Sequence, residues 1–107
     1  MGYLTMRHAT PRRNLPSILS GGIDPKYHMC VRPEVWLHSA CKTAWAILHT
    51  GQRHQVSTGD IAVVTVRVPR QWLVRRRRCV WTVDCRIPPA FIVSVNPRAA
   101  LAEAGAA

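Results

Sequence analysis

The chain has 107 residues, of which 48% are apolar, and this length suits one compact domain and excludes two independent cores. Fifteen Lys and Arg residues against five acidic residues give a formal net charge of +10, and thirteen of the fifteen are Arg. This excess favours anionic partners such as nucleic acid, a dinucleotide pyrophosphate or an acidic protein, although a GC-rich genome also enriches a protein in Arg and Ala.

No apolar run approaches the roughly 20 residues needed to cross a bilayer, and the first residues lack the pattern of a secretory signal. We therefore expect a soluble, cytoplasmic protein. The four cysteines, Cys30, Cys41, Cys79 and Cys85, include no Cys-x-x-Cys pair, which predicts neither a disulfide framework nor a standard zinc site. We interpret them as reduced core thiols and predict no metal, because a set of Cys30, Cys41 and the nearby histidines has an unusual spacing.

The first predicted elements are a strand and a short helix. Leu4, Met6 and His8 alternate with polar residues, which is typical of a strand with one buried face. His8 should therefore point the same way as the apolar side chains. Asn14 is placed to cap a helix over residues 15–20, which two glycines would end.

A second strand and a second helix follow. Residues 35–38 are predicted to form a short strand, after which Ser39 would cap a helix over about residues 40–49, with Gly51 closing it. The helix spacing predicts a buried stripe made of Ala44, Ile47 and Leu48.

The second half of the chain is predicted to be mainly strand. Residues 61–68 are continuously apolar enough for a central strand, and residues 79–85 and 91–95 give two more. The run Arg75–Arg78 between them would usually be a solvated loop. Five short strands and two helices predict an α+β fold. Residues 97–107 would form a frayed Ala-rich helix or a disordered tail.

Several short motifs resemble the ADP-ribosyltransferase fold. The block Arg7–Ile23, with its His-x-Thr, Ile-Leu pair and glycine turn, is similar to the opening motif of DarT-like DNA ADP-ribosyltransferases and of RNA 2′-phosphotransferases. Val35–Ser39, Ile61–Val68 and Ile87–Ile92 resemble the later strands of these families. The resemblance predicts a small single domain over residues 1–96, built on a split β-sheet of the ADP-ribosyltransferase type with two short helices.

The resemblance also implies an NAD site. His8 would fix the nicotinamide ribose, which suits a neutral imidazole with one donor and one acceptor, and Thr10 would supply a hydroxyl. Trp36 would stack on nicotinamide, His38 would join it on the same strand face, and Arg32 would contact the pyrophosphate. For His8, Trp36 and His38 the alternatives are, respectively, a core histidine, a core tryptophan and a partly exposed histidine at a strand end.

The catalytic carboxylate is the open question. Ala90 stands where many relatives carry Glu in an Ile-Pro-Pro-Glu motif, and transfer needs a carboxylate that polarises a ribose hydroxyl or activates the acceptor. Among the five acids we predict Asp84, a strand residue, as the substitute. The alternative is the RNA 2′-phosphotransferase chemistry, which uses Arg and His around NAD.

We expect the arginine run, Arg75, Arg76, Arg77 and Arg78, to contact nucleic acid through phosphates. The leading hypothesis is an NAD-dependent ADP-ribosyltransferase-like protein acting on nucleic acid or another macromolecule. The alternatives are a catalytically inactive module of the same fold that binds nucleic acid or a partner protein, and a small toxin or antagonist. The sequence leaves the oligomeric state open.

Overall fold

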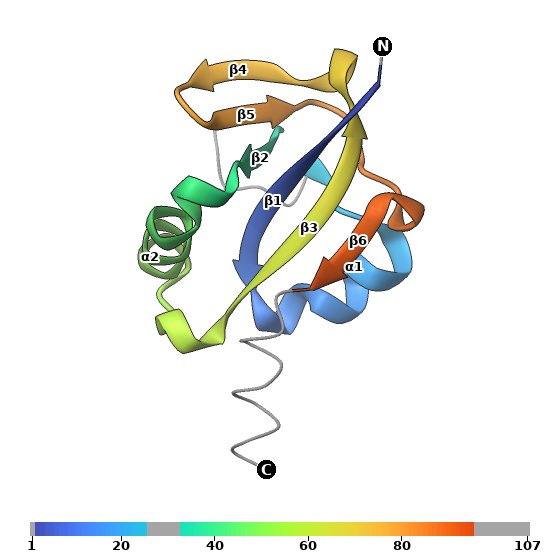
Figure 1. The fold of residues 1–107 in the computed structure, drawn as a ribbon. Coiled ribbons are helices and arrows are strands. Elements are labelled where there is room, and N and C mark those ends of the chain that lie inside the picture. The colour runs from blue at the N-terminus through green and yellow to red at the C-terminus, as the bar shows by residue number, and fades with distance from the viewer. Residues whose placement is uncertain (1, 26–32, 96–107) are drawn as a thin grey trace.

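The computed structural model describes residues 2–25 and 33–95, which form one six-stranded antiparallel sheet with two α-helices (Figure 1). The strands are β1 Tyr3–Pro11, β2 Val35–His38, β3 Ile61–Pro69, β4 Val74–Arg77, β5 Val80–Val83 and β6 Ile92–Val95. The helices are α1 Leu15–Gly21 and α2 Thr43–His54. The predicted α+β class is confirmed, with six strands in the order β4-β5-β2-β1-β3-β6 instead of the five expected.

β1 and β3 form the backbone of the sheet. They pair antiparallel over nine positions, from Tyr3 opposite Pro69 to Pro11 opposite Ile61. β3 is buried along most of its length, as its continuous apolar run predicts. The main core cluster collects side chains from both halves of the chain, namely Met6, Ile18, Ile23, Val35, Leu37, Val64, Val66, Val68, Val83 and Ile87.

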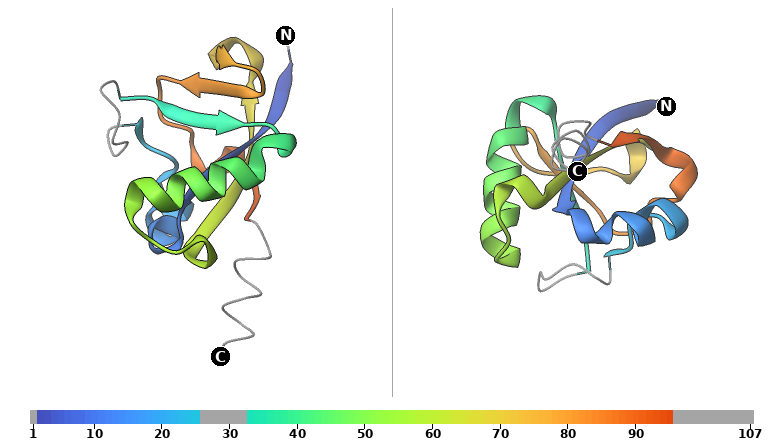
Figure 2. Two further views of the ribbon diagram at one scale, coloured as in Figure 1. Left: turned by 90° about the vertical axis from the view of Figure 1, so that its left-hand side faces the viewer. Right: turned by 90° about the horizontal axis from the view of Figure 1, so that it is seen from below.

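The sheet is nearly divided between β1 and β2. These two strands pair at a single position, Arg7 opposite His38, so β4, β5 and β2 form one group and β1, β3 and β6 another. α1 and α2 lie apart, on different sides of the β1–β3 pair (Figure 2). Residues of both helices line a cleft at this point of the sheet.

The arginine run is a strand and not a loop. Residues 74–77 form β4, the edge strand beside β5, and Arg78 and Cys79 make a two-residue turn in which Cys79 has a φ of +64°. The side chain of Arg76 reaches Glu34 and Thr82. The pairing with β5 and these side-chain contacts explain why a charged run takes an extended form.

α2 differs from its prediction in register. The helix begins at Thr43, after a 3-10 turn over Ala40–Lys42, and continues past Gly51 to His54. Its buried residues are Ala46 and Gly51, whereas Leu48 is 53% exposed. A Cβ atom at Gly51 would lie 3.0 Å from the main-chain oxygen of Val56, so this glycine serves close packing and does not stop the helix.

Gly22 ends α1 with a φ of +87°, and a Cβ atom there would collide with the carbonyl of Ile87. The next residue, Ile23, exchanges two 2.9 Å main-chain hydrogen bonds with Ile87. Only glycine fits this approach, which fixes the segment after α1 against the strand connection before β6.

Among the described residues, no helix is both long and apolar enough to span a bilayer. The predicted domain boundary at residues 96 and 97 and the Ala-rich segment 97–107 lie outside the described part of the chain, as does Arg32.

Candidate functional site

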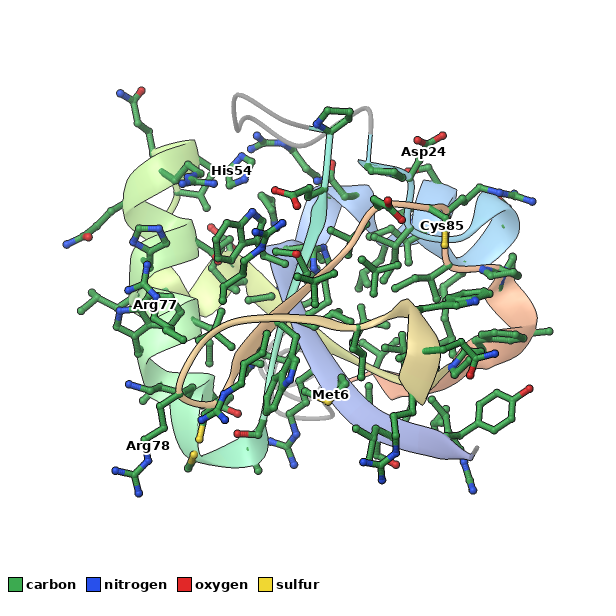
Figure 3. All side chains as sticks on the ribbon, turned by 90° about the horizontal axis from the view of Figure 1, so that it is seen from above. Met6, Asp24, His54, Arg77, Arg78 and Cys85 are labelled. Atoms are coloured by element: carbon green, nitrogen blue, oxygen red, sulfur yellow. The ribbon has the colours of Figure 1, made fainter. Side chains whose placement is uncertain are left out.

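A cleft of about 1210 Å³ opens between the two helices, above the point where β1 and β2 diverge. Its floor comes from residues 8–10 of β1 and 35–38 of β2, one wall from α1, and the other wall from α2. Figure 3 shows the labelled His54 and Arg77 on the α2 side and Asp24 on the α1 side. A second pocket, beside Tyr3 and Phe91, has a volume of only about 410 Å³.

His8 bridges the two diverging strands at the floor. Its Nδ1–H donates a 2.9 Å hydrogen bond to the main-chain carbonyl of Trp36, where the β1–β2 ladder has already ended. Burial lowers the pKa of His8 below 6.5, although the hydrogen bond to Trp36 opposes this shift. The ring is therefore neutral near pH 7, with its proton on Nδ1 and an acceptor lone pair on Nε2.

Two polar atoms of the floor residues are buried and have no hydrogen-bond partner among residues 2–25 and 33–95. These are Nε1 of Trp36 and Nε2 of His38, and both residues line the cleft. His38 is 3% exposed, and burial, with smaller effects from His8 and Arg7, lowers its pKa to about 4. Buried polar groups are nearly always hydrogen-bonded, so these two atoms suggest a site that a ligand or water completes.

Thr10 and Asn14 form a second polar group on the α1 side of the floor. Asn14 occupies the predicted N-cap position of α1, but its amide donates to the Thr10 hydroxyl over 3.2 Å and makes no capping bond with the helix. The side-chain oxygen of Asn14 is therefore not used as a cap. Both residues line the cleft.

An aromatic platform lies on the α2 wall. Trp45 and His49 stack with ring centroids 5.1 Å apart and planes 8° from parallel. The guanidinium of Arg77, from β4, lies 5.8 Å from the Trp45 ring centre, and the Lys42 ammonium lies 5.9 Å from it. Trp45 is 38% exposed. Aromatic rings flanked by cations are suited to planar, anionic ligands such as nucleotides.

The charge of the cleft is strongly positive. The described lining includes Arg13, Arg53, Arg77 and Arg86, and Asp24 is its only acid. Burial lowers the pKa of the neighbouring His54, and Arg13 and Arg53 add to the shift by repulsion. Such a lining favours a ligand that carries several negative charges.

The structure brings together four of the predicted cofactor residues, His8, Thr10, Trp36 and His38. Asp84 is exposed after the end of β5 and does not line the cleft, whereas Arg77 from the predicted nucleic-acid run does.

The sequence analysis missed the α2 wall. Trp45, His49 and Arg53 are spaced by four residues each, and all three line the cleft. This spacing places them on one helix face, and it was a usable signal. The predicted apolar stripe of Ala44, Ile47 and Leu48 lies on a different face of the helix.

No protein-family model matches the chain, and no curated protein matches it significantly.

Proposed function

We propose that this chain is an NAD-dependent ADP-ribosyltransferase-like protein, which binds the dinucleotide in the cleft and acts on nucleic acid or another macromolecule. The observation that carries the proposal is His8. Its hydrogen bond to the Trp36 carbonyl fixes both the tautomer and the ring position on the floor of the cleft. The motif resemblance assigns to the same residue the fixing of the nicotinamide ribose.

The residues present fit a dinucleotide in size and in polarity. The cleft volume of about 1210 Å³ lies above the range of about 300–1,000 Å³ that is typical of small-molecule pockets. An extended ligand with two nucleosides has space there. Its polar lining includes His8, Thr10, Asn14 and the positively charged side chains of the two walls.

Each region of the cleft has a separate task in this proposal. Nε2 of His8 would accept a hydrogen bond from a ribose hydroxyl, and the hydroxyl of Thr10 would contact the adjoining sugar. Trp36 would hold the nicotinamide ring, and Arg13 and Arg53 would neutralise the pyrophosphate. When bound, NAD supplies a glycosidic bond that is activated by the positive charge of its pyridinium ring.

The acceptor would approach along the α2 wall. The Trp45 platform, together with Arg77 and the neighbouring edge strand β4, joins stacking to phosphate neutralisation at the same rim. Single-stranded nucleic acid is bound by this combination. Nucleic acid is therefore the acceptor class that this rim favours.

A second candidate is a catalytically inactive NAD-binding module of the same fold. The observation in its favour is the scarcity of carboxylates, because Asp24 is the only acid in the described lining. A chain that binds NAD but lacks a positioned carboxylate would sense or sequester it without rapid turnover.

Calorimetric titration of the purified chain with NAD tests the proposal. We expect one site per chain and a weakening of about tenfold or more in His8→Ala, since that variant loses a ligand hydrogen bond and the ring that bridges β1 and β2. His8→Asn retains a short polar side chain, and Thr5→Ala, an exposed β1 residue outside the cleft, is the matched control. NAD binding of wild-type strength in folded His8→Ala would overturn the proposal, as would the absence of binding to the wild-type chain.

A further inference from the structure

Two cysteines from distant parts of the chain lie side by side. The Sγ atoms of Cys41 and Cys79 are 3.2 Å apart, although 38 residues separate them in sequence. Both are free thiols, Cys41 is exposed and Cys79 is half-buried. The expectation that these cysteines are core thiols is therefore wrong for Cys41 and incomplete for Cys79.

Ordered backbone holds both thiols in place. Cys41 lies in the 3-10 turn Ala40–Lys42, directly after β2, and Cys79 lies in the tight turn between β4 and β5. The main-chain N–H of Ser39 donates a 3.1 Å hydrogen bond to the carbonyl of Cys79. This main-chain bond joins the residue before the first turn to the second turn and holds the two sulfur atoms near each other.

The surroundings favour a reactive thiolate at Cys79. Hydrogen bonds from Ser39 and then from Cys41 lower the pKa of Cys79, and the nearby cations Arg78 and Lys42 lower it further. In contrast, burial raises the pKa of Cys85. A thiolate next to a second thiol, in an accessible and electropositive place, is the arrangement found in redox-sensing cysteine pairs.

We propose that Cys41 and Cys79 form a redox modification site that hydrogen peroxide converts into a reversible disulfide. The Cys79 thiolate attacks one peroxide oxygen, an S–O bond forms, the O–O bond breaks, and the leaving hydroxide takes a proton to become water. The Cys41 sulfur then attacks the Cys79 sulfenic acid, and the departing hydroxide takes the Cys41 proton as the second water. Two thiols lose two electrons, and one peroxide is reduced.

The site borders the cleft without belonging to its floor. The turn that holds Cys79 follows Arg77, and the turn that holds Cys41 leads into α2, which carries Trp45. A bond between the two cysteines would join the Arg77 side of this wall to the start of α2. The chemistry depends on the two sulfur atoms alone, so it stands or falls separately from NAD binding.

The test uses a Cys30→Ser, Cys85→Ser background, so that Cys41 and Cys79 are the two remaining cysteines of the chain. Removing Cys85 also avoids a tryptic peptide that contains both Cys79 and Cys85. After peroxide treatment we expect the intact mass to be lower by two hydrogen atoms and the protein to run as a monomer on a non-reducing gel. Neither cysteine should then react with an alkylating reagent. Dithiothreitol should restore both thiols. The oxidised form should also melt several degrees higher, because the bond closes a long loop of the unfolded chain.

Single variants in this background identify the attacking sulfur. With Cys41→Ser, peroxide should give a Cys79 sulfenic acid that dimedone traps. With Cys79→Ser, oxidation of Cys41 should be at least several-fold slower. In the wild-type chain, peroxide treatment should protect Cys41 and Cys79 from alkylation by joining them in a disulfide, whereas Cys85 should still be alkylated. Two alkylatable thiols after peroxide treatment of the folded background protein would overturn the disulfide, and equal rates in the two single variants would overturn the role of Cys79.

Discussion

The guanidinium of Arg76 pairs with the carboxylate of Glu34 beside the hydroxyl of Thr82, which contacts both of them. The side chain of Glu34 is 11% exposed and that of Arg76 is 33% exposed. One arginine of the run Arg75–Arg78 thus forms an ion pair within the protein. This ion pair connects the edge strand β4 to the segment before β2.

The ion pair between Arg76 and Glu34 predicts that removing the arginine costs more stability than neutralising the glutamate. Arg76→Ala leaves a buried carboxylate unpaired and should lower the free energy of unfolding by about 2–3 kcal/mol, below the range for fully buried pairs because water reaches the guanidinium. Glu34→Gln removes the charge but keeps two polar atoms, and should cost about 1 kcal/mol. Urea unfolding measures both. Arg75→Ala, an exposed neighbour, should change stability by less than about 0.5 kcal/mol; equal costs for all three would contradict the prediction.

The remaining arginines of the run allow a sharper test of nucleic-acid binding. Arg75→Gln with Arg78→Gln should reduce the slope of log affinity against log salt for single-stranded DNA by about 1.4, since each lost phosphate contact removes ~0.7. The double variant Arg67→Gln with Arg70→Gln removes the same charge from β3 and the turn after it. We expect its slope to match wild type. Fluorescence anisotropy over a salt series gives the slopes, and identical slopes in the two double variants would leave β4 without a specific role.

The two candidate carboxylates can be separated by turnover of NAD. Asp24 lines the cleft, whereas the sequence favours Asp84, which is exposed outside it. We expect slow nicotinamide release without an acceptor, and a further decrease of ~10²–10⁴ in Asp24→Asn, because a positioned acid or base contributes that much. Asp84→Asn should behave as wild type. Rapid release that neither substitution affects would favour the arginine and histidine chemistry of the RNA 2′-phosphotransferases.

His38 should make stability depend on pH. Its pKa is about 4 in the folded protein and 6.5 in the unfolded chain, so between these values the unfolded state binds more protons and stability falls as the pH is lowered. For one such group the loss between pH 7 and pH 5 is about 2 kcal/mol, and His8 shifts in the same direction. In His38→Gln the loss should be smaller by that amount. Urea unfolding at the two pH values checks this, and an unchanged pH dependence in a folded variant would show that His38 titrates normally.

Periodicity predicted the elements whose apolar pattern is strong. The strands at residues 35–38 and 61–68 are confirmed, and so is the inward direction of His8 at 9% exposure. The edge strand β4 was missed because its extended form depends on pairing with β5 and on Glu34, both distant in sequence. Strand propensity, which depends on neighbouring residues in the sequence, does not predict contacts of this kind.

The sequence likewise predicted one part of the candidate site and missed another. Short motifs predicted the floor residues His8 and Trp36, which the structure places together in one cleft. The α2 wall was missed because the predicted buried stripe was Ala44, Ile47 and Leu48, whereas Ala44 and Leu48 are exposed and Ile47 is half-buried. Helical propensity fixes the existence of a helix better than its rotation, and here Ala46 and Gly51 decide that rotation by close packing.

The single pairing of Arg7 with His38 has a mechanical consequence. A sheet that holds together over nine positions between β1 and β3 but over one between β1 and β2 has a seam along the cleft floor. The amide protons of β2 should therefore exchange with solvent water sooner than those of β3, through openings that leave the β1–β3 pair intact. A ligand that contacts His8 on one side of the seam and His38 on the other would raise the free energy of these openings, and slower exchange in β2 would report its binding.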